Sequence, residues 1–74
     1  MKNSDVRVLE RVKSYVYQLC LREEYGIVTF EHIVEHFTDV LMPETARWCM
    51  SNRETVECII DSHINFFGGE SDSL

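Results

Sequence analysis

His32, Glu35 and His36 are the residues of this sequence whose types and spacing could do chemistry. Two histidines four positions apart fall on one face of a helix, where both imidazoles can hold a zinc ion. A glutamate beside the second histidine could then act as the base that activates a metal-bound water. The stretch HIVEH therefore raises the hypothesis of metal-assisted hydrolysis.

The neighbouring residues argue against that hypothesis. The H-x-x-E-H spacing is that of a class of zinc peptidases, but such a site also needs a third protein ligand and a dry cavity. The apolar residues of the segment repeat on the opposite face of the helix, at Phe30, Ile33, Val34, Phe37, Val40 and Leu41. We therefore expect the histidines on a solvated polar face, where adventitious zinc binding is the most they would support. No catalysis, bound metal or other cofactor is expected.

The length and composition predict one small folded unit. The chain has 74 residues, of which 45% are hydrophobic and 11% aromatic, and this is rich enough in apolar residues to form a core. A chain of this size buries only about 60% of the surface that its unfolded form exposes, so it has little room for a catalytic cleft. We predict a single helical domain over residues 1–69 and a disordered acidic tail over residues 70–74.

Membrane segments and disulfides are not indicated. No apolar run approaches the roughly 18 residues that a membrane-spanning helix needs, and the polar start MKNSD does not resemble a secretory signal. Cys20, Cys49 and Cys58 are odd in number and lack metal-binding spacing, so we expect reduced thiols. These features predict a cytoplasmic protein.

Hydrophobic periodicity predicts an all-α fold, a compact bundle of three to four short helices. The expected helices cover residues 5–23, 30–41, about 43–50, and a last segment from about 52 to Gly68-Gly69. Ile27 and Val28 are expected to form a short extended link between the first two helices. An apolar stripe runs along the first helix, at Val6, Leu9, Val12, Val16, Leu19 and Cys20.

Local capping signals mark most of the helix ends. Ser4 or Asp5 could cap the first helix, and Gly26 could end it in the left-handed conformation. Thr29 is expected to cap the second helix, and Pro43 suits the first turn of the third. The sequence Ser51-Asn52-Arg53-Glu54 matches a capping box and is expected to open the last helix.

Residues 29–50, TFEHIVEHFTDVLMPETARWCM, resemble a helix-turn-helix. The resemblance implies a DNA-binding regulator, but the turn at residues 38–42 is longer than the usual three or four residues and lacks glycine. The exposed face of the first helix of the motif carries Glu31, Glu35 and Asp39 without a lysine or arginine. The presumptive reading helix offers only Arg47. We therefore do not expect nucleic-acid binding, because little counterion release would accompany it.

The charge distribution favours a protein partner instead. The net charge is −6, and the acids are concentrated after residue 25, so the surface should attract a partner with a basic surface. Several apolar side chains at the edges of the predicted stripes either contact that partner or fill the edges of a small core. The predicted partner-binding residues are Trp48, Tyr17, Leu21, Phe66, Glu31, Glu35, Asp39 and Arg47.

We therefore expect a small acidic interaction protein, such as a regulatory subunit, an adaptor or an inhibitor. One alternative is a dimeric helix-turn-helix transcriptional regulator. Another is an inhibitor of a nucleic-acid-binding host protein, because the small size and acidity resemble those of virus- or mobile-element-encoded inhibitors. A homodimer fits both the interaction protein and the DNA-binding regulator, since a core this small gains from burying the apolar patch of a second copy.

Overall fold

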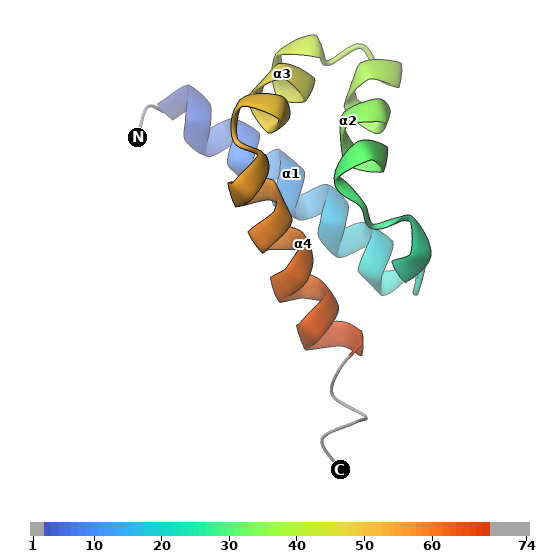
Figure 1. Ribbon diagram of the computed structural model, residues 1–74. Helices are drawn as coiled ribbons and strands as arrows, with labels where there is room; N and C mark the ends of the chain where they lie inside the picture. Colours follow the sequence, from blue (N-terminus) through green and yellow to red (C-terminus); the bar gives the residue numbers. More distant parts are fainter. Residues whose placement is uncertain (1–2, 69–74) are drawn as a thin grey trace.

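The computed structural model describes residues 3–68, and it confirms the all-α prediction. Four helices form a compact globule, and no strand occurs within those residues. They are α1 (Asn3–Leu21), α2 (Phe30–Asp39), α3 (Pro43–Ser51) and α4 (Arg53–Gly68). A 3-10 turn, η1 (Tyr25–Ile27), replaces the extended link that was predicted before α2. In Figure 1, α2 and α3 stand side by side, while α1 crosses behind α3 and α4.

All four helices contribute side chains to one core. Val12, Val16 and Leu19 of α1 follow a helical spacing and are fully or almost fully buried. They belong to one cluster with Ile33 of α2 and Val56 of α4. Each such side chain contributes about 1.5–3 kcal/mol by leaving water. This cluster fixes the positions of the helices that carry the surface groups described below.

The first helix ends differently from the prediction. Glu23, not Gly26, takes the left-handed conformation, with φ of 60°. Its N–H donates to the carbonyl of Cys20 at 3.0 Å, and the N–H of Glu24 donates to the carbonyl of Leu19 at 3.0 Å. This is the Schellman arrangement that satisfies the last carbonyls of a helix. At the other end α1 begins at Asn3, so Ser4 and Asp5 lie within its first turn and do not precede it.

The start signals of α2 and α3 are confirmed. The Thr29 hydroxyl accepts a hydrogen bond from the His32 N–H at 3.2 Å and so caps α2. Pro43 lies in the first turn of α3, where a missing N–H has no consequence. These two residues set where each helix begins, and they leave a short segment between the helices.

The connection from α2 to α3 is shorter than predicted. Because α2 ends at Asp39, only Val40, Leu41 and Met42 join it to α3. Leu41 adopts a left-handed φ of 61°. Its N–H donates to the Thr38 carbonyl at 3.2 Å, and the Met42 N–H donates to the Phe37 carbonyl at 2.8 Å. The predicted five-residue turn at 38–42 was therefore wrong, and the observed length is typical of a helix-turn-helix.

A single residue, Asn52, separates α3 from α4. Its backbone N–H donates to the carbonyls of Trp48 and Cys49, and its side-chain amide donates to the Trp48 carbonyl at 2.9 Å. Ser51 is the last residue of α3, so the capping box predicted to begin at Ser51 does not open α4. The local pattern was present, but the third helix extends into it.

The predicted acidic tail at residues 70–74 and the boundary at residue 69 lie outside the described residues. The last helix extends to Gly68, as the glycine pair suggested. Within residues 3–68, no helix combines the length and apolar character that crossing a bilayer requires.

Candidate functional site

The two histidines of the HIVEH stretch contact α1 and do not lie on an open polar face. The ring of Tyr15 stacks on His36, with centroids 3.7 Å apart and planes 8° from parallel. The hydroxyl of Tyr15 lies 2.9 Å from Nε2 of His32. Both histidines are half-buried. The prediction of a solvated face was wrong for this pair, because Tyr15 projects from α1 over that side of α2.

This contact changes the acid-base properties of its members. Burial lowers the pKa of His36, the neighbouring His32 lowers it further, and Asp39 opposes the shift. Burial also raises the pKa of the Tyr15 phenol. No cluster of three metal-binding side chains occurs in the described part of the chain. A metal on this pair would also have to displace the phenol from Nε2 of His32. The three rings therefore act as a polar clasp between α1 and α2.

An apolar groove of about 780 Å³ opens beside this clasp, between α1 and the end of α2. Phe37 and Tyr15 line it next to His36, and Val40 and Met42 line it from the α2–α3 connection. The remaining lining residues come from α1: Val6, Arg7, Glu10, Arg11, Ser14 and Gln18. We call this feature the α1–α2 groove.

Two apolar residues at the α2–α3 connection are exposed, contrary to the prediction. Val40 and Leu41 were expected on the buried stripe of α2, yet Val40 is exposed and Leu41 is 86% exposed. Met42 is also exposed. The physical reason is that α2 ends before them, and the left-handed residue Leu41 turns the chain away from the core. Leu41 borders a smaller hollow that shares Arg11 and Met42 with the groove.

Val6 was also predicted in a buried stripe, and it too is exposed and lines the groove. Arg11 has a different role. Its guanidinium donates to the hydroxyl of Thr45 at 2.7 Å, and Thr45 is completely buried in α3. Within residues 5–67, neither Arg7 nor Arg11 has a carboxylate at ion-pair distance. Because Glu10 lines the same side, the α1 wall of the groove carries one net positive charge.

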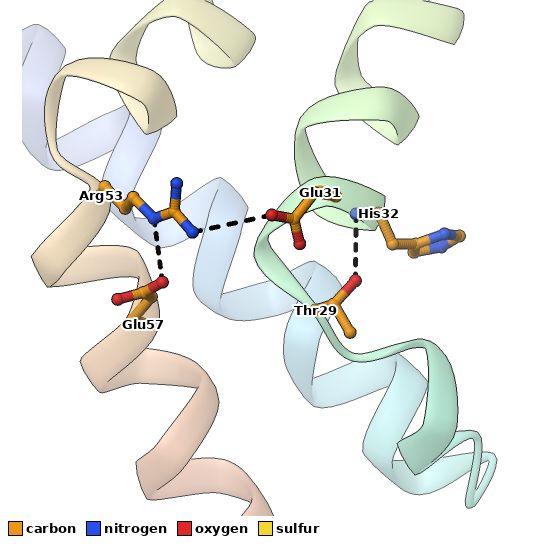
Figure 2. A network of polar contacts seen from close by, with 5 residues as sticks. All are labelled: Thr29, Glu31, His32, Arg53 and Glu57. Atoms are coloured by element: carbon orange, nitrogen blue, oxygen red, sulfur yellow. Dashed lines mark hydrogen bonds and ion pairs between the residues drawn. The ribbon is translucent and has the colours of Figure 1, made fainter.

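The predicted acidic residues Glu31, Glu35 and Asp39 are all exposed on the outer face of α2. Figure 2 shows that Glu31 faces Arg53 of α4, with 3.6 Å between carboxylate and guanidinium. Arg53 also donates to Glu57 at 3.0 Å. Such exposed pairs contribute little to stability, but they reduce the charge that Glu31 presents to a partner.

Arg53 lies over the ring of Phe30, 4.6 Å from its centroid. The ring and the two carboxylates together engage the Arg53 guanidinium in contacts within the protein. Arg47 is exposed on α3. Of the two basic residues after residue 25, only Arg47 therefore remains available to an external anion.

The predicted apolar contact residues divide into two groups. Tyr17 and Phe66 line one small hollow between α1 and α4, and Leu21 lies one turn beyond Tyr17 on α1. Trp48 lies elsewhere, on α3. It was expected to project from the surface, but it is half-buried and packs against the core. Its indole fills the edge of the core, which was the alternative left open for these residues.

His63 behaves as a half-buried histidine in the last helix. Its Nδ1 lies 2.8 Å from the carbonyl of Ile59, and its ring stacks near Phe67 with centroids 6.5 Å apart. This contact satisfies one ring nitrogen inside α4. We therefore assign His63 to the packing of α1 against α4.

Comparisons with protein-family models, with curated proteins and with solved structures found no match to this chain. The candidate site therefore rests on the geometry of the α1–α2 groove and the charges around it.

Proposed function

We propose that this chain is a small protein-docking module that binds a partner through the α1–α2 groove. The partner inserts apolar side chains between Tyr15 and Met42, and the acidic face of α2 attracts its basic groups. The chain then acts by occluding the partner or by recruiting it, as an inhibitor, adaptor or regulatory subunit does. Inhibition of a nucleic-acid-binding host protein is one form of this activity, because such partners carry basic surfaces.

The observation that carries this proposal is the apolar groove with exposed side chains at its border. Clefts of 300–1,000 Å³ are typical of binding sites, and the groove measures about 780 Å³. Leu41 beside it is 86% exposed and holds a strained backbone. A leucine in that conformation is unfavourable for folding alone, so its presence supports a role in contact with another molecule.

The acidic charges of α2 support the approach of a basic partner from that side of the groove. Asp39 directly precedes Val40, which lines the groove, so the acidic face and the groove adjoin at the end of α2. Neither Glu35 nor Asp39 forms an ion pair within residues 5–67. Exposed charges of this kind mainly raise the association rate of a complementary partner. Glu35 and Asp39 are therefore the residues that steer the encounter.

The proposal is tested by capturing partners from the native host with matched methionine variants. Met42 lines the groove, whereas Met50 is exposed on α3 outside it. We expect Met42→Glu to lose the captured protein and Met50→Glu to retain it. Equal capture by wild type and Met42→Glu would contradict docking in the groove. With the partner in hand, Glu35→Lys is expected to slow association about tenfold at low salt and much less at high salt.

A DNA-binding regulator is the second candidate, and the three-residue connection from α2 to α3 favours it. The charges oppose it, because the outer face of α2 is acidic and Arg53 is engaged by two carboxylates. Fluorescence anisotropy against random duplex at about 50 mM salt separates the candidates, since a DNA binder shows steep salt dependence. Micromolar binding that is lost in Arg47→Ala would favour DNA over a protein partner.

A further inference from the structure

One exposed face of α4 carries no charge. Thr55, Cys58, Ser62 and Phe66 are all exposed and recur at helical spacings of three, four and four residues. The other exposed positions of the helix hold all of its charged residues: Arg53, Glu54, Glu57 and Asp61. A neutral face is unusual on a chain whose net charge is −6. We call these four residues the neutral stripe.

The neutral stripe continues onto α1 through an aromatic contact. Tyr17 meets Phe67 edge to face, with centroids 5.6 Å apart, and Phe66 meets Phe67 at 5.2 Å. Between them lies a hollow of about 280 Å³ lined by Tyr17, Ser62, His63, Phe66 and Phe67. None of these is an acid, a lysine or an arginine. The α1–α4 surface is therefore apolar, hollowed and free of full charges at its centre.

We propose that a second copy of this chain binds here, in a two-fold contact between neutral stripes. A two-fold contact places the same surface patch of both copies face to face, so a stripe whose charges share one sign would oppose like charges. The acidic faces of α2 and α4 repel a second copy for that reason, whereas the neutral stripe does not. A basic or acidic partner would find no complementary charge at this surface. This surface is separate from the α1–α2 groove, so the two proposals stand independently.

The exposed area bounds the size of this contact. Phe66 is 65% exposed, Leu21 50% and Tyr17 45%. At roughly 200 Å² for a large side chain, these three cover on the order of 300 Å² in each copy. With the smaller residues of the stripe, a dimer buries about 1,000 Å² in total, near the lower limit for a specific interface. We therefore expect a dissociation constant in the micromolar range.

Sedimentation velocity with matched serine variants tests the proposal. We expect the wild type to shift from monomer towards dimer between about 5 and 500 µM. Ser62→Glu places two carboxylates in the contact and should remain monomeric, whereas Ser51→Glu, an exposed serine on α3, should behave as the wild type. Far-ultraviolet circular dichroism checks that both variants are folded. A wild type that stays monomeric at about 500 µM, or a Ser62→Glu variant that dimerises equally, overturns the proposal.

Cys58 provides a second readout, because its own thiol reports whether this surface is covered. It is the exposed cysteine, whereas Cys20 and Cys49 are buried, and burial raises the pKa of Cys49 to about 11. Iodoacetamide alkylates the Cys58 thiolate with loss of iodide, and mass spectrometry follows the product. The rate should fall several-fold as the protein concentration rises through the dimer transition, and it should stay constant in Ser62→Glu. A dimer whose formation leaves the Cys58 rate unchanged would place the interface elsewhere and refute the assignment.

Discussion

Replacing Leu41 by glycine is expected to stabilise the fold. An L-residue in the left-handed region costs about 1–2 kcal/mol, and glycine avoids this cost because it has no Cβ. The greater freedom of glycine in the unfolded chain offsets about 0.5–1 kcal/mol of that gain. Leu41 is 86% exposed, so the substitution removes little apolar burial. The free energy of unfolding should therefore rise by about 0.5–1 kcal/mol.

Urea denaturation measures this change, with the fluorescence of the single tryptophan, Trp48, as the signal. For an m-value of about 1 kcal/mol/M, the midpoint should rise by about 0.5–1 M. Leu41→Ala keeps the Cβ and therefore the strain, so its unfolding free energy should stay within about 0.5 kcal/mol of wild type. The comparison of glycine with alanine separates backbone strain from loss of the leucine side chain.

Glu23→Gly is the matched control, because Glu23 has the same left-handed backbone at the end of α1. It should gain stability as Leu41→Gly does, but it should leave partner capture unchanged. Both Leu41 variants should weaken capture. A Leu41→Gly midpoint equal to or below that of wild type, at unchanged m-value, would show that the backbone at Leu41 is not strained, and the inference from its conformation would fail.

Three further predictions concern the contacts of α1. Because the folded state lowers the pKa of His36, its stabilising contribution is present above about pH 6.5 and is lost as the pH falls through the folded pKa. Urea midpoints between about pH 7.5 and 5.5 should therefore fall more steeply in wild type than in His36→Phe, which keeps a ring against Tyr15; parallel profiles would contradict this. Tyr15→Phe removes the hydroxyl that lies 2.9 Å from His32, so its unfolding free energy should drop by about 0.5–1.5 kcal/mol. An unchanged unfolding free energy in urea denaturation would mean that water fully replaces the hydrogen bond. Thr45→Val removes the buried acceptor of Arg11 and should lower the free energy of unfolding by about 1–2 kcal/mol. An equal loss in the Arg11→Met background and in the wild type would show that the two groups are not coupled.

The sequence predicted the helices well where local and periodic signals agree. In α2, Ile33 and Phe37 are buried as the spacing indicated, and Thr29 and Pro43 mark the helix starts. The exposed acids Glu31, Glu35 and Asp39 followed from the same periodicity. Such features depend on neighbours within one or two turns, so a single sequence contains the information that decides them.

The groove was not predictable from the sequence, because it depends on how α1 and α2 pack. Tyr15 carries no pattern that places it on His36, since the two residues meet only through the crossing of the helices. The apolar periodicity wrongly predicted that Leu41 is buried, for a related reason. Glycine is the usual signal for a left-handed helix end, and a leucine at that position reads as one more residue of the apolar stripe.

The α3–α4 connection and the turn before α2 also differ in whether they can accommodate inserted residues. Asn52 alone joins α3 to α4 and donates three hydrogen bonds to α3, so an inserted residue there would rotate one helix against the other. Gly26 lies in an exposed turn with open space where a Cβ would project. An epitope tag placed at Gly26 would therefore preserve the helix packing, and natural length variation in proteins of this architecture should accumulate before α2 and be absent between α3 and α4.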